Sequence, residues 1–182
     1  VLVVAALGAE ARYVPAGLRV VVTGLGKVAA ASAVTRALAA YENPSTVTVL
    51  NIGTAGALRV GLDGLHEPGV VLNHDMNAEA VRALGIDPRE RLEVGDSDVV
   101  LASGDVFVTD PVVRDRLAQQ AHLVDMEGYA VAWVVDSFGA RLRMAKHVSD
   151  NADESAMEWP ERVDASAKVL GEWVAQVVPT LI

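Results

Sequence analysis

Acidic residues stand where several short apolar segments of the sequence end, and they carry most of the chemistry that the chain could perform. They are Glu10 after the apolar opening, Asp125 and Glu127 after a short apolar run, and Asp150 at the end of another. A carboxylate near a hydrophobic core must be paired, solvated or kept protonated. Because such groups can give or take a proton, these positions are candidates for acid–base catalysis.

All of these residues except Glu127 also have an ordinary structural explanation. Glu10 could be an exposed residue in the first turn of a helix, where the helix dipole stabilises negative charge. Asp125 could cap the helix that follows it, and Ser149 or Asp150 could cap the next one. The local sequence leaves both explanations open at each position.

Short apolar segments alternate with helical patterns along the chain. The segments are rich in β-branched residues and bounded by Gly, Asp or Asn, which is typical of buried strands. Predicted strands cover residues 1–6, 18–23, 47–51, 69–72, 99–102 and 144–149, and predicted helices cover residues 28–41, 126–138 and 163–177. This alternation predicts an α/β fold over residues 1–182, a single domain with three α/β/α layers and a central twisted mixed, mostly parallel sheet. Ligands of such sheets bind beyond the carboxyl ends of the strands, where the acidic candidates lie.

The composition narrows the classes of protein and partner. A chain of 182 residues with 52% hydrophobic and 21% charged residues is expected to form one folded domain. Its net charge of -9 repels nucleic acid and anionic membranes, so neither is expected as a partner. No apolar run reaches the roughly 18 residues of a membrane-spanning helix. The absence of cysteine favours a reducing compartment, the cytoplasm, and the apolar opening is predicted to be a strand rather than a signal peptide.

Neither a metal ion nor a cofactor is expected. His74 and Asp75 are adjacent, so their side chains would point to opposite faces of a strand. The other histidines, His66, His122 and His147, do not have the spacing of metal ligands.

Two glycine-rich segments, residues 24–27 and 53–56, each follow a predicted strand. They are either tight turns or places where backbone N–H groups approach a ligand, and neither matches a P-loop or a dinucleotide fingerprint. The polar stretch 85–98 is predicted to hold a surface loop or a turn. Phe107, one of only two phenylalanines, is either a stacking platform or a core residue.

Six segments, taken together and in order, resemble the nucleoside phosphorylase and nucleosidase superfamily. They are ALGAEAR, TGLGKVAAA, LNIGTAGAL, ASGDVFV, VDMEGYAVA and HVSDNAD, all within residues 1–157. The resemblance is strongest to the methylthioadenosine/S-adenosylhomocysteine nucleosidases. It implies a small-molecule purine nucleoside as the partner, hydrolysis of its N-glycosidic bond, and a place in nucleoside catabolism such as methionine salvage.

The resemblance implies a role for each acidic residue by its position. Glu10 matches the family's water-activating glutamate, and Asp150 matches the aspartate that protonates or hydrogen-bonds N7 of the purine. Glu127 matches the glutamate that holds the ribose 2′ and 3′ hydroxyls, with Met126 beside the sugar. These roles fit the chemistry, because breaking the bond develops positive charge on the ribose and negative charge on the base. Asp150 must then hold a proton at neutral pH, which burial favours, while Glu10 must stay ionised.

The same matching by position implies further substrate-binding residues. Phe107 is expected to stack on the base, and the backbone of Val108 is expected to bind the base edge. Thr54 stands where the nucleosidases usually have serine, and it keeps a hydroxyl near the catalytic water and the ribose. Ser149, beside Asp150, is also expected to bind the substrate.

The residues opposite the ribose distinguish hydrolysis from phosphorolysis, because phosphate needs cationic anchors. Phosphorylases of the superfamily have arginine at the position of Glu10 and near Asn51, and this sequence has no cation at either. Water is therefore the expected nucleophile. Phosphorolysis is an alternative if Arg12 and Lys27 point into the cleft, and a non-catalytic nucleoside-binding protein is a second alternative.

The sequence departs from the family in length and at two positions near the site. It is short between residues 75 and 103, where relatives carry structure that helps to enclose the 5′ substituent. The 5′ group is therefore open, and futalosine-type nucleosides are candidates. Lys146 stands in place of a family arginine, and His147 stands where a small residue is usual. Because relatives often dimerise, a homodimer is expected.

Overall fold

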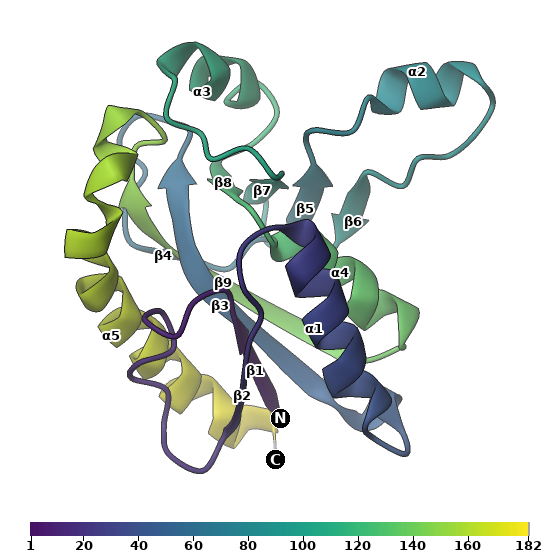
Figure 1. Cartoon of the computed structure of the whole chain (residues 1–182), viewed down its shortest axis with the longest axis vertical. Coiled ribbons are helices and arrows are strands. Elements are labelled where there is room, and N and C mark those ends of the chain that lie inside the picture. Colours follow the sequence, from purple (N-terminus) through teal and green to yellow (C-terminus); the bar gives the residue numbers. More distant parts are fainter. Residues whose placement is uncertain (182) are drawn as a thin grey trace.

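The apolar segments form the strands of one nine-stranded sheet in the computed structural model, which describes residues 1–181 (Figure 1). Their β-branched residues suit the pleated, buried surface of a sheet. The strands are β1 (Leu2–Ala5), β2 (Arg19–Val22), β3 (Thr48–Ala57), β4 (Leu65–His66), β5 (Val70–Asn73), β6 (Arg91–Glu93), β7 (Val100–Ser103), β8 (Leu123–Asp125) and β9 (Arg141–Asp150). All six segments predicted as strands form strands, and β3 and β9 are longer than predicted.

Helices cover both faces of the sheet, so the predicted three-layer α/β/α arrangement is confirmed (Figure 1). They are α1 (Lys27–Ala39), α2 (Ala78–Ala83), α3 (Pro111–Leu117), α4 (Gly128–Ser137) and α5 (Trp159–Val177), with short 3-10 turns at Pro44–Thr46, Glu154–Glu158 and Val178–Leu181. Successive residues of β1 point to opposite faces of the sheet. Leu2 packs in a core with α1 and α4, whereas Val3 packs in a core with α5.

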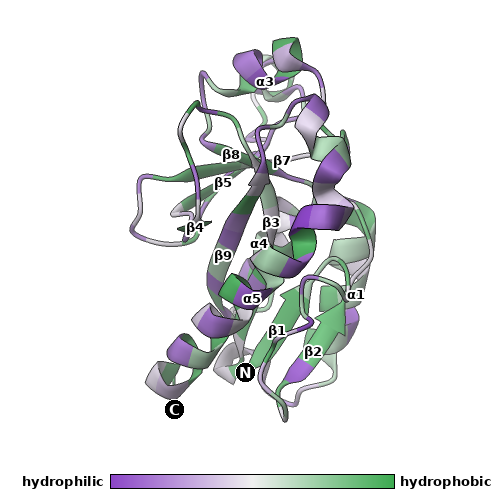
Figure 2. Cartoon of the chain, turned by 90° about the vertical axis from the view of Figure 1, so that its left-hand side faces the viewer, coloured by the Kyte–Doolittle hydropathy of each residue, from purple (hydrophilic) through white to green (hydrophobic). Residues whose placement is uncertain are grey.

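Helix α5 forms because its apolar residues recur at helical spacing. Val163, Ala167, Leu170 and Val174 are buried against the sheet, and Pro160 stands in the first turn, where its missing N–H costs nothing. Hydrophilic and hydrophobic stretches alternate along the helix in Figure 2. Among residues 1–181, no helix combines the length and the apolar character needed to cross a membrane.

The sheet brings strand ends together beside β3. Strand β9 runs parallel to β3 along one edge, so β1 and β8 must share the other edge. Strand β1 is parallel to β3 and pairs with it up to Asn51, whereas β8 is antiparallel and pairs only at Gly56 and Ala57. The carboxyl ends of β1 and β8 therefore approach each other, and they leave residues 52–55 of β3 uncovered on this edge.

Apart from the 3-10 turns, and from β8, which is the short apolar run that ends at Asp125, four elements of the structure are not predicted by the sequence. Strands β4 and β6 are too short to show a periodic pattern, and helix α2 buries none of its residues and projects away from the sheet (Figure 1). Helix α3 buries only Leu117. The polar stretch 85–98, predicted as a loop or turn, contains β6, and the glycine-rich segment 53–56, predicted as a possible turn, lies inside β3.

Candidate active site

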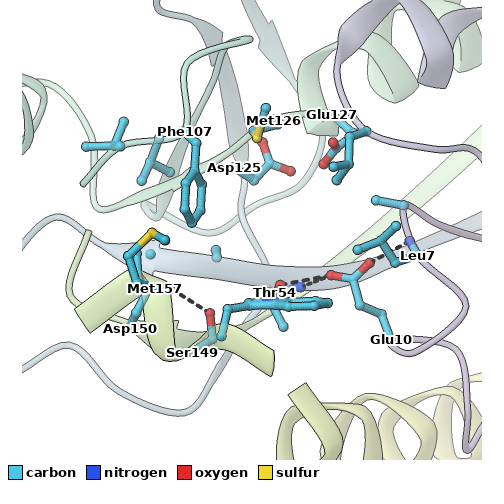
Figure 3. A pocket seen from close by; sticks show the side chains of 18 of the residues that line it. Leu7, Glu10, Thr54, Phe107, Asp125, Met126, Glu127, Ser149, Asp150 and Met157 are labelled. Carbon is cyan, nitrogen blue, oxygen red and sulfur yellow. Dashed lines mark hydrogen bonds between the residues drawn. The ribbon is translucent and has the colours of Figure 1, made fainter. Parts of the chain in front are cut away.

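A pocket of about 460 Å³ opens where the carboxyl ends of β1 and β8 meet beside β3 (Figure 3). This volume suits a small organic molecule. All eight predicted site residues line the pocket: Glu10, Thr54, Phe107, Val108, Met126, Glu127, Ser149 and Asp150. The structure therefore brings together residues that lie up to 140 positions apart, as the sheet topology requires.

Glu10 lies in a turn after β1, with only 4% of its surface exposed. Its Oε1 accepts hydrogen bonds from the Thr54 N–H at 2.8 Å and the Thr54 hydroxyl at 2.9 Å, and its Oε2 accepts one from the Leu7 N–H at 3.0 Å (Figure 3). The carboxylate thus satisfies an N–H on the uncovered edge of β3. The alternative of an exposed residue in a helical turn is wrong, because the chain forms no helix here and the side chain is buried.

Glu127 stands between β8 and α4 and is also buried. Its Oε1 accepts a 2.7 Å hydrogen bond from the N–H of Gly26, just before α1. Gly26 has a φ of 86°, and a Cβ there would lie 2.8 Å from Asp105, so only glycine fits. Burial, and then the negative charge of Asp125, raise the pKa of Glu127 to about 7. This carboxyl group therefore changes its charge near neutral pH.

Asp125 and Lys146 form a buried ion pair with an Oδ2–Nζ distance of 2.9 Å. Asp125 also accepts hydrogen bonds from the Ser103 hydroxyl and from the N–H of Gly128, the first residue of α4. The N-cap position of α4 is Glu127, so Asp125 is not the N-cap that the capping alternative required, although its carboxylate holds the first N–H of the helix. Burial opposes the charge of Lys146, but Asp125 outweighs it and raises the pKa of the ammonium group. Lys146 lies behind the pocket wall, where its ammonium group forms an ion pair with Asp125 and does not line the pocket.

Asp150 is the last residue of β9 and is 6% exposed. Its Oδ1 accepts a hydrogen bond from the Ala152 N–H at 2.8 Å, and its Oδ2 accepts one from the Ser149 hydroxyl at 2.7 Å. Ala152 has a φ of 51°, which a non-glycine residue adopts only where its surroundings hold it. Gly56 leaves room for the carboxyl group, since a Cβ there would lie 3.0 Å from Oδ1. The next helical turn is capped by Asp153, so the capping alternative for Ser149 and Asp150 is wrong.

The mouth of the pocket is apolar and open to solvent. Phe107 is 50% exposed, so the alternative that it belongs to the core is wrong. Leu25, Val106 and Met157 are exposed to at least the same degree. Val108, by contrast, is buried under this mouth. A flat ligand entering the pocket would find apolar side chains before it reached the carboxyl groups.

Cationic side chains point away from the pocket. Arg12 pairs with Asp164 at the surface, with an Nη1–Oδ1 distance of 3.2 Å. Lys27 donates to Asn73 at 2.7 Å and pairs with Asp75. Among the described residues, no lysine or arginine lines the pocket. A phosphate ion in this pocket would therefore meet carboxylates and no cationic anchor.

Within residues 1–181, no group of three His, Asp or Glu side chains is arranged to hold a metal ion. His147 lies on β9 but turns away from the pocket, and its Nδ1 shares a 3.0 Å hydrogen bond with the Ser166 hydroxyl on α5. Burial lowers the pKa of His147. This histidine is therefore part of the contact between β9 and α5.

The sequence interpretation missed Trp159, which lines the pocket. Its Nε1–H donates a 2.8 Å hydrogen bond to the Thr54 hydroxyl. The available signal was a tryptophan directly before Pro160 at the start of the last helix, because helices of α/β folds begin near ligand-binding strand ends.

The family of the chain follows from a match between its sequence and a family model. Residues 64–182, well over half of the chain, match the model of the phosphorylase superfamily. The chain belongs to the phosphorylase superfamily. The membership implied by the six sequence segments is therefore confirmed, and three of the segments lie inside the matched range.

Curated proteins with similar sequences are nucleosidases of this superfamily. The aminodeoxyfutalosine nucleosidase of Helicobacter pylori strain 26695 is 31% identical over 107 residues, which are 57% of this chain and 46% of that protein. The 5′-methylthioadenosine/S-adenosylhomocysteine nucleosidase of Shewanella sp. strain MR-7 is 28% identical over 172 residues, with coverage of 78% and 70%. The match thus spans less than half of the length of the Helicobacter protein.

Solved structures of the superfamily share the fold. The Helicobacter pylori 5′-methylthioadenosine/S-adenosylhomocysteine nucleosidase superposes with a TM-score of 0.84 at 24% identity, over 98% of this chain and 97% of that chain. The Neisseria meningitidis nucleosidase has a TM-score of 0.81 at 23% identity, over 98% of both chains. The predicted nucleoside phosphorylase-like fold is confirmed.

Proposed function

We propose that the protein hydrolyses the N-glycosidic bond of a purine nucleoside and releases the free base and the sugar. The observation that carries this proposal is a pocket lined by the carboxyl groups of Glu10, Glu127 and Asp150 and, among the described residues, by no lysine or arginine. Carboxyl groups can protonate a leaving base, activate water and stabilise a positively charged sugar. The same groups repel phosphate, so water is the nucleophile. Similarity to curated nucleosidases supports the same reaction.

The base end of the proposed reaction uses Asp150 and Phe107. The purine stacks on the exposed ring of Phe107, and the backbone of Val108 binds the base edge. Asp150 gives a proton to N7 as the bond to the ribose breaks, so that the base leaves without negative charge. The hydrogen bonds from Ser149 and Ala152 fix the carboxyl group at the end of β9.

The sugar end uses Glu10 and Glu127, which lie together on the side of Figure 3 away from Asp150. Ionised Glu10 accepts a proton from the attacking water while Thr54 and Leu7 hold its two oxygens. Glu127 binds the ribose hydroxyls, and Met126 packs beside the ring. The negative charge of both carboxylates stabilises the positive charge that develops on the sugar.

The leading substrate of the proposal is a 5′-thio-substituted adenosine. Support comes from relatives named as 5′-methylthioadenosine/S-adenosylhomocysteine nucleosidases and from the Neisseria meningitidis enzyme, which was crystallised with methylthio-immucillin-A. The aminodeoxyfutalosine nucleosidases of Helicobacter pylori make a futalosine-type nucleoside the second candidate. The apolar mouth, whose side chains are exposed to solvent, suits a 5′ group of either kind.

The proposal is tested by incubating the chain in phosphate-free buffer with methylthioadenosine, S-adenosylhomocysteine, aminodeoxyfutalosine, adenosine and inosine. Chromatography of the products should detect free base from at least one of them, and Asp150→Asn should slow its release by about 10³-fold. If no nucleoside releases base, the proposed function is wrong. Thermal stabilisation by a nucleoside without turnover would then identify a nucleoside-binding protein.

We further propose that residues 1–182 act as a single domain in the cytoplasm, in the nucleoside salvage that feeds methionine recycling, and that two copies form a homodimer. The absence of cysteine supports a reducing compartment. The exposed apolar side chains of Leu25, Phe107 and Met157 support a dimer, because apolar patches on a surface mark interaction sites. Sedimentation should give twice the 19.1 kDa mass of the chain, and a monomer at all concentrations would exclude the dimer.

A further inference from the structure

Trp159 makes a polar contact that the reaction proposed above does not use. It is the first residue of α5, and it lines the pocket opposite strand β3. Its indole Nε1–H donates a 2.8 Å hydrogen bond to the Thr54 hydroxyl, which lies 2.9 Å from Oε1 of Glu10. Three segments that are far apart in the sequence thus meet in one chain of hydrogen bonds, from Trp159 through Thr54 to Glu10.

The chemistry of the three groups allows only one donor-to-acceptor order in this series of hydrogen bonds. An indole N–H can only donate a hydrogen bond, and an ionised carboxylate can only accept one. The Thr54 hydroxyl has one proton and two lone pairs. It therefore accepts from Trp159 with a lone pair and points its proton at Glu10 for as long as Glu10 is ionised.

The contact matters because the Thr54 hydroxyl faces the pocket. Without a donor on its oxygen, the hydroxyl is free to rotate and to donate to a water molecule or a ligand in the pocket instead. The indole N–H removes that freedom by occupying the oxygen from the side of α5. Oε1 of Glu10 then keeps two donors, the hydroxyl and the N–H of the same threonine.

We propose that Trp159 is a positioning residue that acts through Thr54 to keep Glu10 ionised and fixed in orientation. This inference rests on the proposed function, in which Glu10 takes a proton from water. Hydrogen bonds to a charged group favour the charged form. The charged groups that face Glu10 from other elements, Lys146 of β9 and Glu127 before α4, are the same in every variant of the test below. Loss of the indole N–H therefore makes Glu10 take up a proton at a higher pH and weakens its action as a base.

The test is a carbon-13 NMR titration of the Glu10 carboxyl carbon in the full chain, assigned with Glu10→Gln. Trp159→Phe keeps an aromatic ring and removes only the donor. Its Glu10 titration midpoint should lie about 0.5 pH unit above that of the wild type, and the midpoint of Thr54→Val should lie about 1 unit above it. In the Thr54→Val background, Trp159→Phe should not shift the Glu10 midpoint further, because both substitutions interrupt the same series of hydrogen bonds.

Two variants serve as controls for the titration. Trp173→Phe removes an indole N–H from the same helix, and this N–H donates to Glu67 at 3.0 Å outside the pocket. Its Glu10 midpoint should equal that of the wild type. Thr54→Ser keeps the hydroxyl and should also titrate like the wild type, which separates the loss of the hydroxyl from a change in packing.

Either of two results would overturn the proposal. One is a Glu10 midpoint in Trp159→Phe that equals the wild-type midpoint within error, with a melting temperature that shows the variant is folded. The other is an equal shift from Trp159→Phe with and without the Thr54 hydroxyl, because the indole would then act on Glu10 by another route.

The titration requires no turnover, so it separates this proposal from the proposed function. If the wild type hydrolyses no nucleoside but the Glu10 midpoints shift as stated, the proposed function is wrong, whereas the proposed action of Trp159 on Glu10 through Thr54 is supported. If the wild type is active, the acidic limb of its kcat/KM profile should move upward in Trp159→Phe by the same amount as the midpoint. An active variant with an unmoved limb would contradict the positioning role.

Discussion

The floor of the pocket consists of buried acidic groups, whereas its rim consists of exposed apolar side chains. The floor residues are Glu10, Asp125, Glu127 and Asp150, and the rim residues are Leu25, Val106, Phe107 and Met157. Each floor carboxyl group accepts hydrogen bonds from the protein, and these bonds hold it before any ligand arrives. No such bonds hold the rim side chains, which meet solvent directly.

This difference assigns separate tasks to the two regions. Groups fixed in advance stabilise developing charge without reorganising, so we propose that the floor residues carry out the reaction. Apolar side chains at an open mouth gain most by covering a ligand or a partner, so we propose that the rim residues determine affinity and the choice of substrate. Substitutions in the floor should therefore change kcat, and substitutions in the rim should change KM.

The largest expected effect comes from Asp150→Asn, which removes the proton donor that we propose for the floor. The amide can still accept the Ala152 hydrogen bond, so the turn after β9 should keep its shape. We expect kcat to fall by about 10³-fold, within the range for loss of a general acid. Steady-state kinetics and a melting curve check this. A folded variant with kcat within about tenfold of the wild type would remove Asp150 from the chemistry.

Glu10→Gln should have the second-largest effect, because a neutral amide does not take a proton from water. We expect kcat to fall by about 10²-fold with little change in KM. Glu67→Gln is the matched control, since the Glu67 carboxylate bonds to Trp173 and Arg143 outside the pocket. Equal losses in the two variants would show that the effect of Glu10 is not specific to the floor.

Glu127→Gln tests what a buried floor carboxyl group costs in stability. The pKa of Glu127 is raised from 4.5 to about 7, so between these values the folded state binds more protons than the unfolded state. The stability that protonated Glu127 gives to the folded state is fully present below pH 4.5 and is lost as the pH rises through about 7. The free energy of unfolding of the wild type falls by about 3 kcal/mol over this pH range, which lowers its melting temperature by roughly 6–12 °C.

The check is the melting temperature of both proteins at pH 4.5 and pH 8. Glu127→Gln should gain stability relative to the wild type on going from the lower to the higher pH, although it should lose activity at both. If the difference in melting temperature between the variant and the wild type does not depend on pH, Glu127 has an ordinary pKa. Its ionisation in the floor would then not destabilise the folded state.

The smallest expected effect comes from the rim. Phe107→Ala should raise KM by about tenfold through the loss of the proposed base stacking, and it should leave kcat within about threefold. Val112→Ala is the matched control, because Val112 is an exposed apolar residue on α3 that does not line the pocket. If Phe107→Ala lowers kcat rather than raising KM, the separation between floor and rim fails.

The floor could be predicted from the sequence because its residues stand in short local segments at strand ends. Glu10, Glu127 and Asp150 each follow an apolar run, and the α/β alternation predicts where the ends of these runs meet. The local sequence did not decide between a site residue and a helix cap. Asp125 fits neither alternative fully, because it stands two residues before the N-cap of α4 and yet accepts the Gly128 N–H while it pairs with Lys146.

Contacts between distant segments could not be predicted in the same way. Trp159 and Thr54 are 105 residues apart, and no periodic pattern links them. The left-handed backbone of Ala152 is held by its surroundings, whereas alanine itself gives no sign of it. The segment 53–56 looked like a turn because glycine permits one, but its glycines lie in β3 and make room for Glu10 and Asp150.

The phosphate dependence of the reaction shows whether the acidic floor uses water or phosphate as the nucleophile. Base release from the preferred nucleoside is measured in phosphate-free buffer and again with added phosphate, and the sugar product is identified by mass spectrometry. If water is the nucleophile, the rates should be equal and the sugar product should be the free sugar in both cases. A reaction that stops without phosphate and yields a sugar 1-phosphate would contradict hydrolysis by water.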